Sequence, residues 1–194
     1  MLRRLYDWTL SLAAHPQALW WMAAISFVES SFFPIPPDLL LIPMVLADRA
    51  KAWIIATVCT VSSVLGGVAG YLIGVFLYEA VAQPVLAFYG YADQFAEFQG
   101  IYNEWGAWLV AGAGLTPFPY KIITILSGVV DMNFLAFMLA SVVGRGGRFY
   151  LEAGLLWYFG APIRSFIEAH LGKLTILFFV LLLGGFLLVK VILP

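Results

Sequence analysis

Residues 34–38 read Pro-Ile-Pro-Pro-Asp and residues 117–121 read Pro-Phe-Pro-Tyr-Lys, and each stretch interrupts an otherwise apolar segment. Both follow the order proline, any residue, proline, any residue, charged residue, with an offset of 83 positions (117 − 34). Proline lacks the backbone N–H and blocks continuation of a helix, so each stretch predicts a helix break. Interrupted apolar segments in corresponding halves of a chain are typical of transporter binding sites.

The composition predicts an integral membrane protein. Of the 194 residues, 63% are hydrophobic and 11% are charged, whereas soluble domains carry about 25% charged residues. The mean hydropathy is +0.96. The sequence shows no metal-ligand cluster, phosphate-binding glycine loop or Ser/His/Asp set. We therefore expect no enzymatic activity, cofactor, metal or nucleic-acid partner.

The chain is predicted to form one membrane domain of seven segments. A full span needs about 20 apolar residues, so the shorter apolar stretches on either side of each proline break are assigned to hairpins. The sequence predicts an interfacial helix (1–14), a first hairpin (17–47), a span (52–78), an external loop or amphipathic segment (79–104), a second hairpin (106–131), a span (134–160) and a final span (174–193).

The distribution of positive charge predicts the topology. Arg3 and Arg4 favour a cytoplasmic N-terminus, and Arg49 and Lys51 favour the cytoplasm as well. Both conditions hold if the segment between them enters and leaves on one side, as a re-entrant hairpin. The segment 79–104, which has acidic residues but no Lys or Arg, then lies outside, and the C-terminus is external.

The predicted fold is an all-α integral membrane protein with an inverted repeat. A re-entrant helical hairpin and a transmembrane helix (17–78) recur upside-down over 106–160, and an extra transmembrane helix follows at the C-terminus. Irregular backbone at membrane depth requires burial in protein or a wet cavity. In the alternative interpretation, each proline stretch only kinks a full-length span.

Two acidic residues flank the first break. Glu29 lies in an apolar run, where an ionisable residue costs at least ~2.5 kcal/mol and indicates function. The structural alternative is pairing with an arginine. Asp38 begins the helix after the break, where a carboxylate also stabilises a helix N-terminus, so function and capping are both open for Asp38.

The second break ends in a cation. Lys121 begins the matching helix, where a positive charge is unfavourable unless an anion offsets it. The alternative is that Lys121 snorkels to the interface. Thr116 is a candidate polar contact at this turn, or a cap of the backbone.

Arg145, Arg148 and Glu152 follow at helical spacing near the middle of span 134–160 and share one face. Arginine presents a planar fork that suits phosphate or carboxylate. We expect Lys121, Arg145, Arg148 and Thr116 to bind an anionic head group, and Glu29, Asp38 and Glu152 to gate the site or carry a proton. An entirely structural ion-pair network is the alternative.

Gly66, Gly70 and Gly74 follow small-xxx-small spacing in the first span. This spacing predicts close packing against neighbouring helices.

Four stretches carry a resemblance to a known family: residues 29–38 (Glu-Ser-Ser-Phe-Phe-Pro-Ile-Pro-Pro-Asp), the glycine-rich residues 66–74, residues 114–121 (Gly-Leu-Thr-Pro-Phe-Pro-Tyr-Lys) and residues 145–149 (Arg-x-x-Arg-Phe). Together they resemble the DedA family (SNARE-associated or VTT-domain proteins), and most closely its small YqaA-like branch. The resemblance covers roughly residues 20–160.

The resemblance implies a bacterial inner-membrane protein with two opposed re-entrant hairpins. Characterised members move polyprenyl phosphate or phospholipid head groups, linked to a proton gradient. Glu29 and Asp38 match the acidic pair of the family, and Lys121 stands where many members have an arginine. A second arginine of many members, just before the second turn, has no counterpart, and Arg145 or Arg148 would substitute for its charge.

We therefore expect a multi-pass flippase-type transporter of the bacterial inner membrane that moves an anionic lipid, a polyprenyl (undecaprenyl) phosphate, with proton coupling. The alternatives are a proton-coupled transporter of a small ion or solute and a non-transporting membrane assembly factor. The limited bulk of a chain of 194 residues also favours a homodimer.

Overall fold

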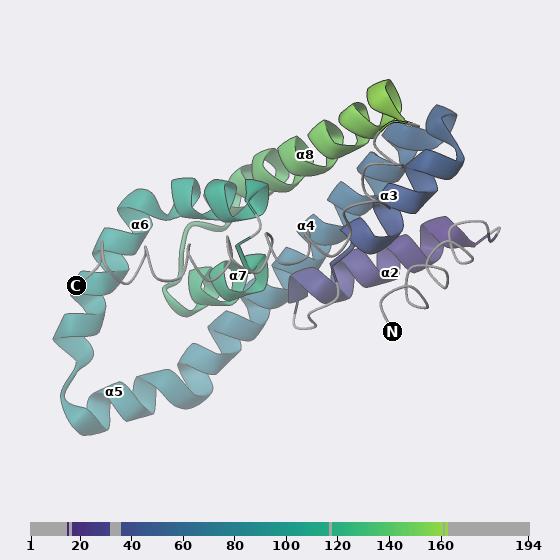
Figure 1. The fold of residues 1–194 in the computed structure, drawn as a ribbon. Helices are drawn as coiled ribbons and strands as arrows, with labels where there is room; N and C mark the ends of the chain where they lie inside the picture. The colour runs from purple at the N-terminus through teal and green to yellow at the C-terminus, as the bar shows by residue number, and fades with distance from the viewer. Residues whose placement is uncertain (1–14, 16, 32–35, 117, 161, 163–194) are drawn as a thin grey trace.

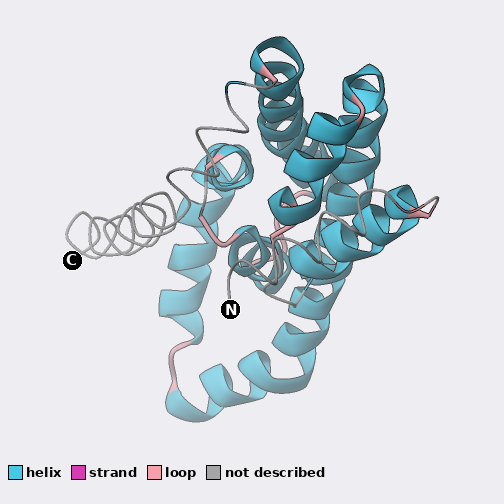
Figure 2. Ribbon diagram, turned by 45° about the vertical axis from the view of Figure 1, so that its right-hand side comes forward, coloured by secondary structure: helices cyan, strands magenta, loops and turns pink. Residues whose placement is uncertain are grey.

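The computed structural model describes residues 15, 17–31, 36–116, 118–160 and 162, and all regular structure in this part of the chain is helical (Figure 2). The interfacial helix expected over 1–14 and the span expected over 174–193 lie outside the described residues. The elements, shown in Figure 1, are α2 (Ala18–Ser31), α3 (Asp38–Ala47), η1 (Arg49–Lys51), α4 (Ala52–Leu77), η2 (Tyr78–Ala82), α5 (Gln83–Tyr89), α6 (Ala92–Leu115), α7 (Tyr120–Val129) and α8 (Phe134–Phe159).

The two proline stretches separate helices, as predicted. Helix α2 ends at Ser31 and α3 begins at Asp38. The Asp38 carboxylate lies in the first turn of α3, where a negative charge interacts favourably with the helix dipole. Helix α6 ends at Leu115, and Thr116 has the extended backbone (φ −93°, ψ 167°) expected before a proline. Helix α7 then begins after Pro119.

The long helices α4 and α8 have 26 residues each, or about 39 Å, and they pack antiparallel. Near the start of α4, the Trp53 ring lies 6.1 Å from the rings of Tyr150 and Trp157 in the second half of α8. Near the other end of α4, the Tyr71 ring lies 5.4 Å from that of Phe134, the first residue of α8. The two helices therefore form the central pair of the fold (Figure 1).

The first helix of each proline-separated pair runs parallel to the long helix that follows it. On α2, the Ser26 hydroxyl donates to the Cys59 carbonyl of α4 (2.8 Å) and the Ser31 hydroxyl donates to the Gly66 carbonyl of α4 (3.0 Å). Later residues of α2 thus meet later residues of α4, so the two helices are parallel. On α6, Gly114 packs against the backbone of Gly144 and Arg145. Two residues later the Thr116 carbonyl meets Arg148.

The second helix of each pair lies on the other long helix. Helix α7 packs along α4 and α3 contacts α8. Glycine permits the approach of α7: a Cβ on Gly74 would lie 2.0 Å from the Ile125 carbonyl oxygen, and one on Gly128 would lie 1.9 Å from that of Tyr71. A Cβ on Gly66 would lie 2.1 Å from the Phe27 oxygen of α2. The close packing predicted from the glycine spacing of α4 is confirmed.

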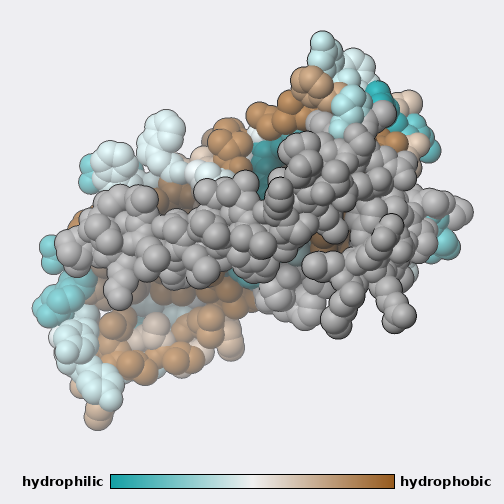
Figure 3. Space-filling view, viewed as in Figure 1, coloured by the Kyte–Doolittle hydropathy of each residue, from teal (hydrophilic) through white to brown (hydrophobic). Residues whose placement is uncertain are grey.

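One helical stretch of the described residues, Arg49–Tyr89, is long and apolar enough to cross a membrane. The helices Asp38–Ala47 and Tyr120–Val129 are apolar but shorter than a span. Helix α8 has the length of a span but carries Arg145, Arg148 and Glu152. Hydrophobic side chains are exposed along η2 and α5, the lower arm in Figures 1 and 3. These features are consistent with the predicted membrane location.

The segment between α4 and the second proline stretch differs from the expected boundaries. Residues 79–104, expected as a loop or amphipathic segment, are helical in η2, α5 and the first half of α6. The first arm of the second hairpin therefore begins at Ala92 instead of residue 106. The break before it falls at Gly90, whose left-handed backbone (φ 72°) ends α5.

We expect Gly128→Ala to destabilise the fold by about 1–3 kcal/mol, because the added methyl group would overpack the contact between α7 and α4. Gly112→Ala on α6 is the matched control, since a Cβ there meets nothing within 4 Å. Thermal unfolding in detergent should show a lower midpoint for Gly128→Ala alone. Equal midpoints for the two variants would contradict this packing.

Candidate functional site

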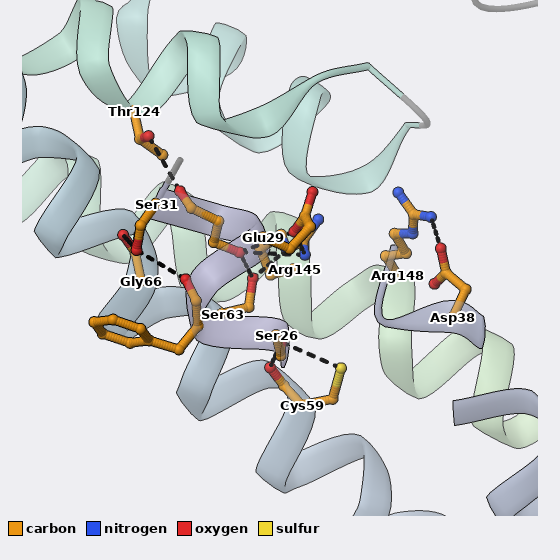
Figure 4. Close-up of polar contacts among 12 residues, drawn as sticks. Ser26, Glu29, Ser31, Asp38, Cys59, Ser63, Gly66, Thr124, Arg145 and Arg148 are labelled. Carbon is orange, nitrogen blue, oxygen red and sulfur yellow. Dashed lines mark hydrogen bonds and ion pairs between the residues drawn. The ribbon is translucent and has the colours of Figure 1, made fainter. Parts of the chain in front are cut away.

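Arg145 of α8 lies at the centre of a polar cluster between helices, and only 2% of its side chain is exposed. Its Nη2 donates to Glu29 Oε2 of α2 at 2.9 Å and to the Ser30 hydroxyl at 3.4 Å. Its Nε donates to the Ser63 hydroxyl of α4. Figure 4 shows Arg145 pointing toward these groups from the opposite helix. The guanidinium therefore ties α8 to both α2 and α4.

Two aromatic rings complete the environment of Arg145. The guanidinium carbon lies 4.9 Å from the ring centroid of Tyr120 on α7 and 4.6 Å from that of Phe149 on α8. Arginine over an aromatic face gains a cation–π attraction. Arg145 is thus held by an ion pair, hydrogen bonds and two rings, contacts that the alternative of a structural ion-pair network would require.

Glu29 and Arg145, expected to carry a proton and to contact an anionic head group, form an ion pair with each other. The side chain of Glu29, the counter-charge of Arg145, is 14% exposed. Removing one partner of a buried pair leaves an uncompensated charge, so the pair also bears on stability, and the two expected roles stay predictions.

Arg148 makes a second, more exposed ion pair. Its Nη2 donates to Asp38 Oδ2 at 2.6 Å, and its Nη1 donates to the Thr116 carbonyl at 3.1 Å. The side chains of Arg148 and Asp38 are 21% and 20% exposed. Asp38 begins α3 and Thr116 follows α6, so Arg148 connects the turns of the two proline-separated pairs.

Thr116 contributes to this site through its backbone. Its hydroxyl donates to the Gly112 carbonyl of its own helix at 2.8 Å, which is the capping role left open in the sequence. The Thr116 carbonyl, and not its hydroxyl, meets Arg148.

Glu152 lies one helical turn beyond Arg148, and its carboxyl group lies against that of Asp38. Arg148 occupies only Oδ2 of the Asp38 carboxylate. The second oxygen of Asp38, Oδ1, is buried and has no hydrogen-bond partner among the described residues. Two carboxyl groups in contact repel when both are ionised, and the Arg148 guanidinium bound to Asp38 offsets this repulsion.

Lys121 belongs to neither ion pair. It lies in the first turn of α7, directly after Tyr120, and is partly exposed. Its side chain makes no ion pair or hydrogen bond with any residue that the structure describes. The expected cluster thus divides into the pair Glu29–Arg145, the group Asp38–Arg148–Glu152, and an uncompensated Lys121.

The serines and aromatic rings around Arg145 are not among the residues predicted from the sequence. Ser30 and Ser63 are fully buried, and their hydroxyls lie 2.7 Å apart. A signal was available: Ser26 and Ser30 are one turn apart on α2 and form a polar stripe on an otherwise apolar helix. Such a stripe predicts a polar contact with another helix. No comparable pattern in the sequence indicated that the rings of Tyr120 and Phe149 would contact Arg145.

Two curated bacterial proteins are similar to the chain over most of its length. An uncharacterized protein of Haemophilus influenzae is 37% identical over 168 residues, which cover 84% of this chain and 87% of the relative. An uncharacterized protein of Histophilus somni has the same identity and coverage. No family model matches the chain. No solved structure matches it either.

We expect Glu29→Ala to destabilise the protein by about 3–5 kcal/mol, because it leaves the Arg145 charge buried without a partner. Unfolding in mixed micelles measures the difference. Glu104→Ala is the control, since Glu104 is an exposed carboxylate on α6 and should change stability by less than about 0.5 kcal/mol. Similar stability of the two variants would mean that the Glu29–Arg145 pair is not structural.

Proposed function

The chain belongs to the family of bacterial proteins that includes these Haemophilus and Histophilus relatives, and we propose that it is a membrane transporter of flippase type. Its substrate would be an anionic lipid, a polyprenyl phosphate, moved across the bacterial inner membrane. The motif resemblance to the DedA family supports this proposal, and we propose that the chain is a DedA-type protein.

The proposed scaffold is an inverted repeat of a re-entrant hairpin and a transmembrane helix. Its support is the correspondence of lengths and positions: α3 and α7 have 10 residues each, and α4 and α8 have 26 each. In both cases the second copy begins 82 residues after the first (120 − 38 and 134 − 52). The antiparallel packing of α4 and α8 supports opposite orientations of the two copies.

The hairpin helices have lengths that suit this arrangement. Ten residues extend about 15 Å, half of a hydrocarbon core of about 30 Å. The two turns would meet near mid-membrane. The N-terminus and Arg49 would be cytoplasmic, Asp131 external and the C-terminus external.

The main support for this function is the exposure and pairing of the two cations at the turns, Arg148 and Lys121. Arg148 is partly exposed and bridges the turns, and Lys121 has no described partner although it lies at a helix N-terminus. A helix N-terminus with a free cation is suited to a phosphate, and the fork of arginine binds phosphate with two hydrogen bonds. A head group at this place would rest on Lys121 and Arg148 while the acyl chain remains in lipid.

In this proposal Asp38 couples binding of the anionic head group to uptake of a proton. A phosphate that takes the Arg148 guanidinium displaces Asp38, which then faces Glu152 without a counter-charge. Two ionised carboxylates in contact are unfavourable, so the pair takes up a proton from the aqueous side that is open. Binding of one anionic head group would thus accompany uptake of one proton.

We expect Lys121→Ala and Arg148→Ala to abolish translocation of polyprenyl phosphate in liposomes, because each removes a cation of the proposed site. Transport of a fluorescent polyprenyl phosphate, with and without a pH gradient, is the measurement. In the same assay Glu152→Gln should transport without responding to the gradient.

Lys51→Ala is the matched control for these variants. Lys51 is paired with Asp48 at 2.9 Å in the exposed turn before α4, where its hydrogen bond lowers the pKa of the Asp48 carboxyl. Wild-type transport in both Lys121→Ala and Arg148→Ala would overturn the site. Equal competition by inorganic phosphate would favour a small-anion transporter, and impaired folding or partner recovery without a transport defect would favour an assembly factor.

We expect Arg49 and Asp131 to lie on opposite sides of the membrane, because they lie at opposite ends of the α4–α8 pair. Arg49 packs against Gly160 at the end of α8, whereas Asp131 precedes the start of α8. In a Cys59→Ala background, Asp131→Cys should react with an impermeant maleimide in intact cells, and Arg49→Cys only after permeabilisation. The wild-type protein is the control, since Cys59 is buried. Reaction of both variants from one side would reject the inverted repeat.

A further inference from the structure

A second polar site lies away from the charged cluster, at the end of the molecule where α6 and the turn between α7 and α8 meet α4 (the left half of Figure 1). A cavity of about 520 Å³ opens there, within the range of about 300–1,000 Å³ that small-molecule sites occupy. Its lining includes Tyr71, Asn103, Asp131, Asn133 and Phe134.

The turn that forms this cavity is fixed from both sides. The Tyr71 hydroxyl of α4 donates to the Met132 carbonyl at 2.6 Å, and the Gln99 amide of α6 donates to the Val130 carbonyl at 2.7 Å. Asp131 between them has a left-handed backbone (φ 51°), and its N–H donates to the Gly128 carbonyl at 3.1 Å. The turn is thus preformed, and it presents the exposed Asp131 side chain to the cavity.

The charge of the cavity selects a cation. Asp131 is the one carboxylate among the described lining residues, which include no Lys, Arg or His, and it has no ion pair with any described residue. From residue 52 to residue 120 the chain has four acidic residues and no Lys or Arg. The nearest following cation, Lys121, lies at the opposite end of α7, about 15 Å away along the helix.

The lining also selects the kind of cation. The described residues contain no group of three or more His, Cys, Asp or Glu that could hold a metal ion. Instead, the Asp131 carboxylate and the Asn103 amide oxygen offer hydrogen-bond acceptors, and neither has a side-chain partner among the described residues. The Asn133 oxygen already caps α8 through the Ala136 N–H (3.0 Å). Tyr71 and Phe134, with ring centroids 5.4 Å apart, add an aromatic wall.

We propose that this cavity binds a primary ammonium group, with Asp131 and Asn103 accepting its hydrogen bonds and Tyr71 and Phe134 contacting its carbon atoms. Two sources share this chemistry: the amine head group of a zwitterionic phospholipid and a free soluble amine. Exposed Leu135 and Trp108 lie on the same helices as the lining residues and would let a lipid reach the cavity from the bilayer.

Binding to the purified full-length chain, measured by native mass spectrometry in detergent, tests the proposal. The probes are two phospholipids with identical acyl chains, one with a phosphoethanolamine and one with a phosphoglycerol head group, and free ethanolamine. We expect the phosphoethanolamine lipid to bind about tenfold more tightly than the phosphoglycerol lipid, as the loss of a charge-assisted hydrogen bond predicts. Competition by free ethanolamine at similar concentration would identify the soluble source.

Asp131→Asn should weaken ammonium binding about tenfold while retaining the fold, because asparagine tolerates the left-handed backbone. Glu104→Gln is the matched control, since it removes an exposed carboxylate next to Asn103 that does not line the cavity, and it should bind as the wild type does. Unchanged binding by a folded Asp131→Asn variant, or equal binding of the two lipids, would overturn the proposal. The readout is binding, so it is independent of whether the charged cluster translocates a lipid.

Discussion

The arrangement of helices depends on the burial of the Arg145 guanidinium. A cation removed from water must be compensated by an opposite charge and hydrogen bonds, and here the compensation comes from three other helices. Glu29 and Ser30 belong to α2, Ser63 belongs to α4 and the Tyr120 ring belongs to α7. Because these helices come from both proline-separated pairs, one side chain fixes how the two halves of the chain meet.

The same pairing divides the charges of the cluster between two tasks. Glu29 compensates Arg145 in the interior, so neither is free for a ligand in this conformation. Asp38 compensates Arg148 nearer the surface, where exchange for another anion needs less desolvation. Lys121 has no counter-charge among the described residues, and Glu152 lies beside Asp38; in the proposed function Lys121 attracts the anion and Glu152 shares a proton with Asp38. The proposed function therefore uses the charges at the turns and not the most buried charge.

Much of the local structure was predictable because its causes are local. Proline chemistry placed the breaks, and hydropathy placed the long helices within one residue of the structure, since spans expected at 52–78 and 134–160 appear as Ala52–Leu77 and Phe134–Phe159. The start of α6 was missed because residues 92–104 mix aromatic and charged side chains. Such a stretch lacks the hydropathy of a span although it is helical.

The roles of Arg145 and Arg148 could not be separated by spacing. Three residues along a helix turn the side chain by a net angle of about 60° and advance it about 4.5 Å, so both appear on one face of α8. That small difference is enough for Arg145 to enter the interface with α2 and α4 while Arg148 reaches the turns. Spacing therefore predicted their neighbourhood but not their environment.

The amino-acid sequence by itself determined the apolar character, the helix breaks and the positions along the helices at which charges occur, because hydropathy and backbone chemistry act over neighbouring residues. Only the tertiary structure decided which carboxylate neutralises which cation. Glu29 and Arg145 are 116 positions apart, and Asp38 and Arg148 are 110 apart. A charge is compensated by what lies within a few ångströms in space, and for these residues that depends on the packing of α2, α3 and α4 against α8.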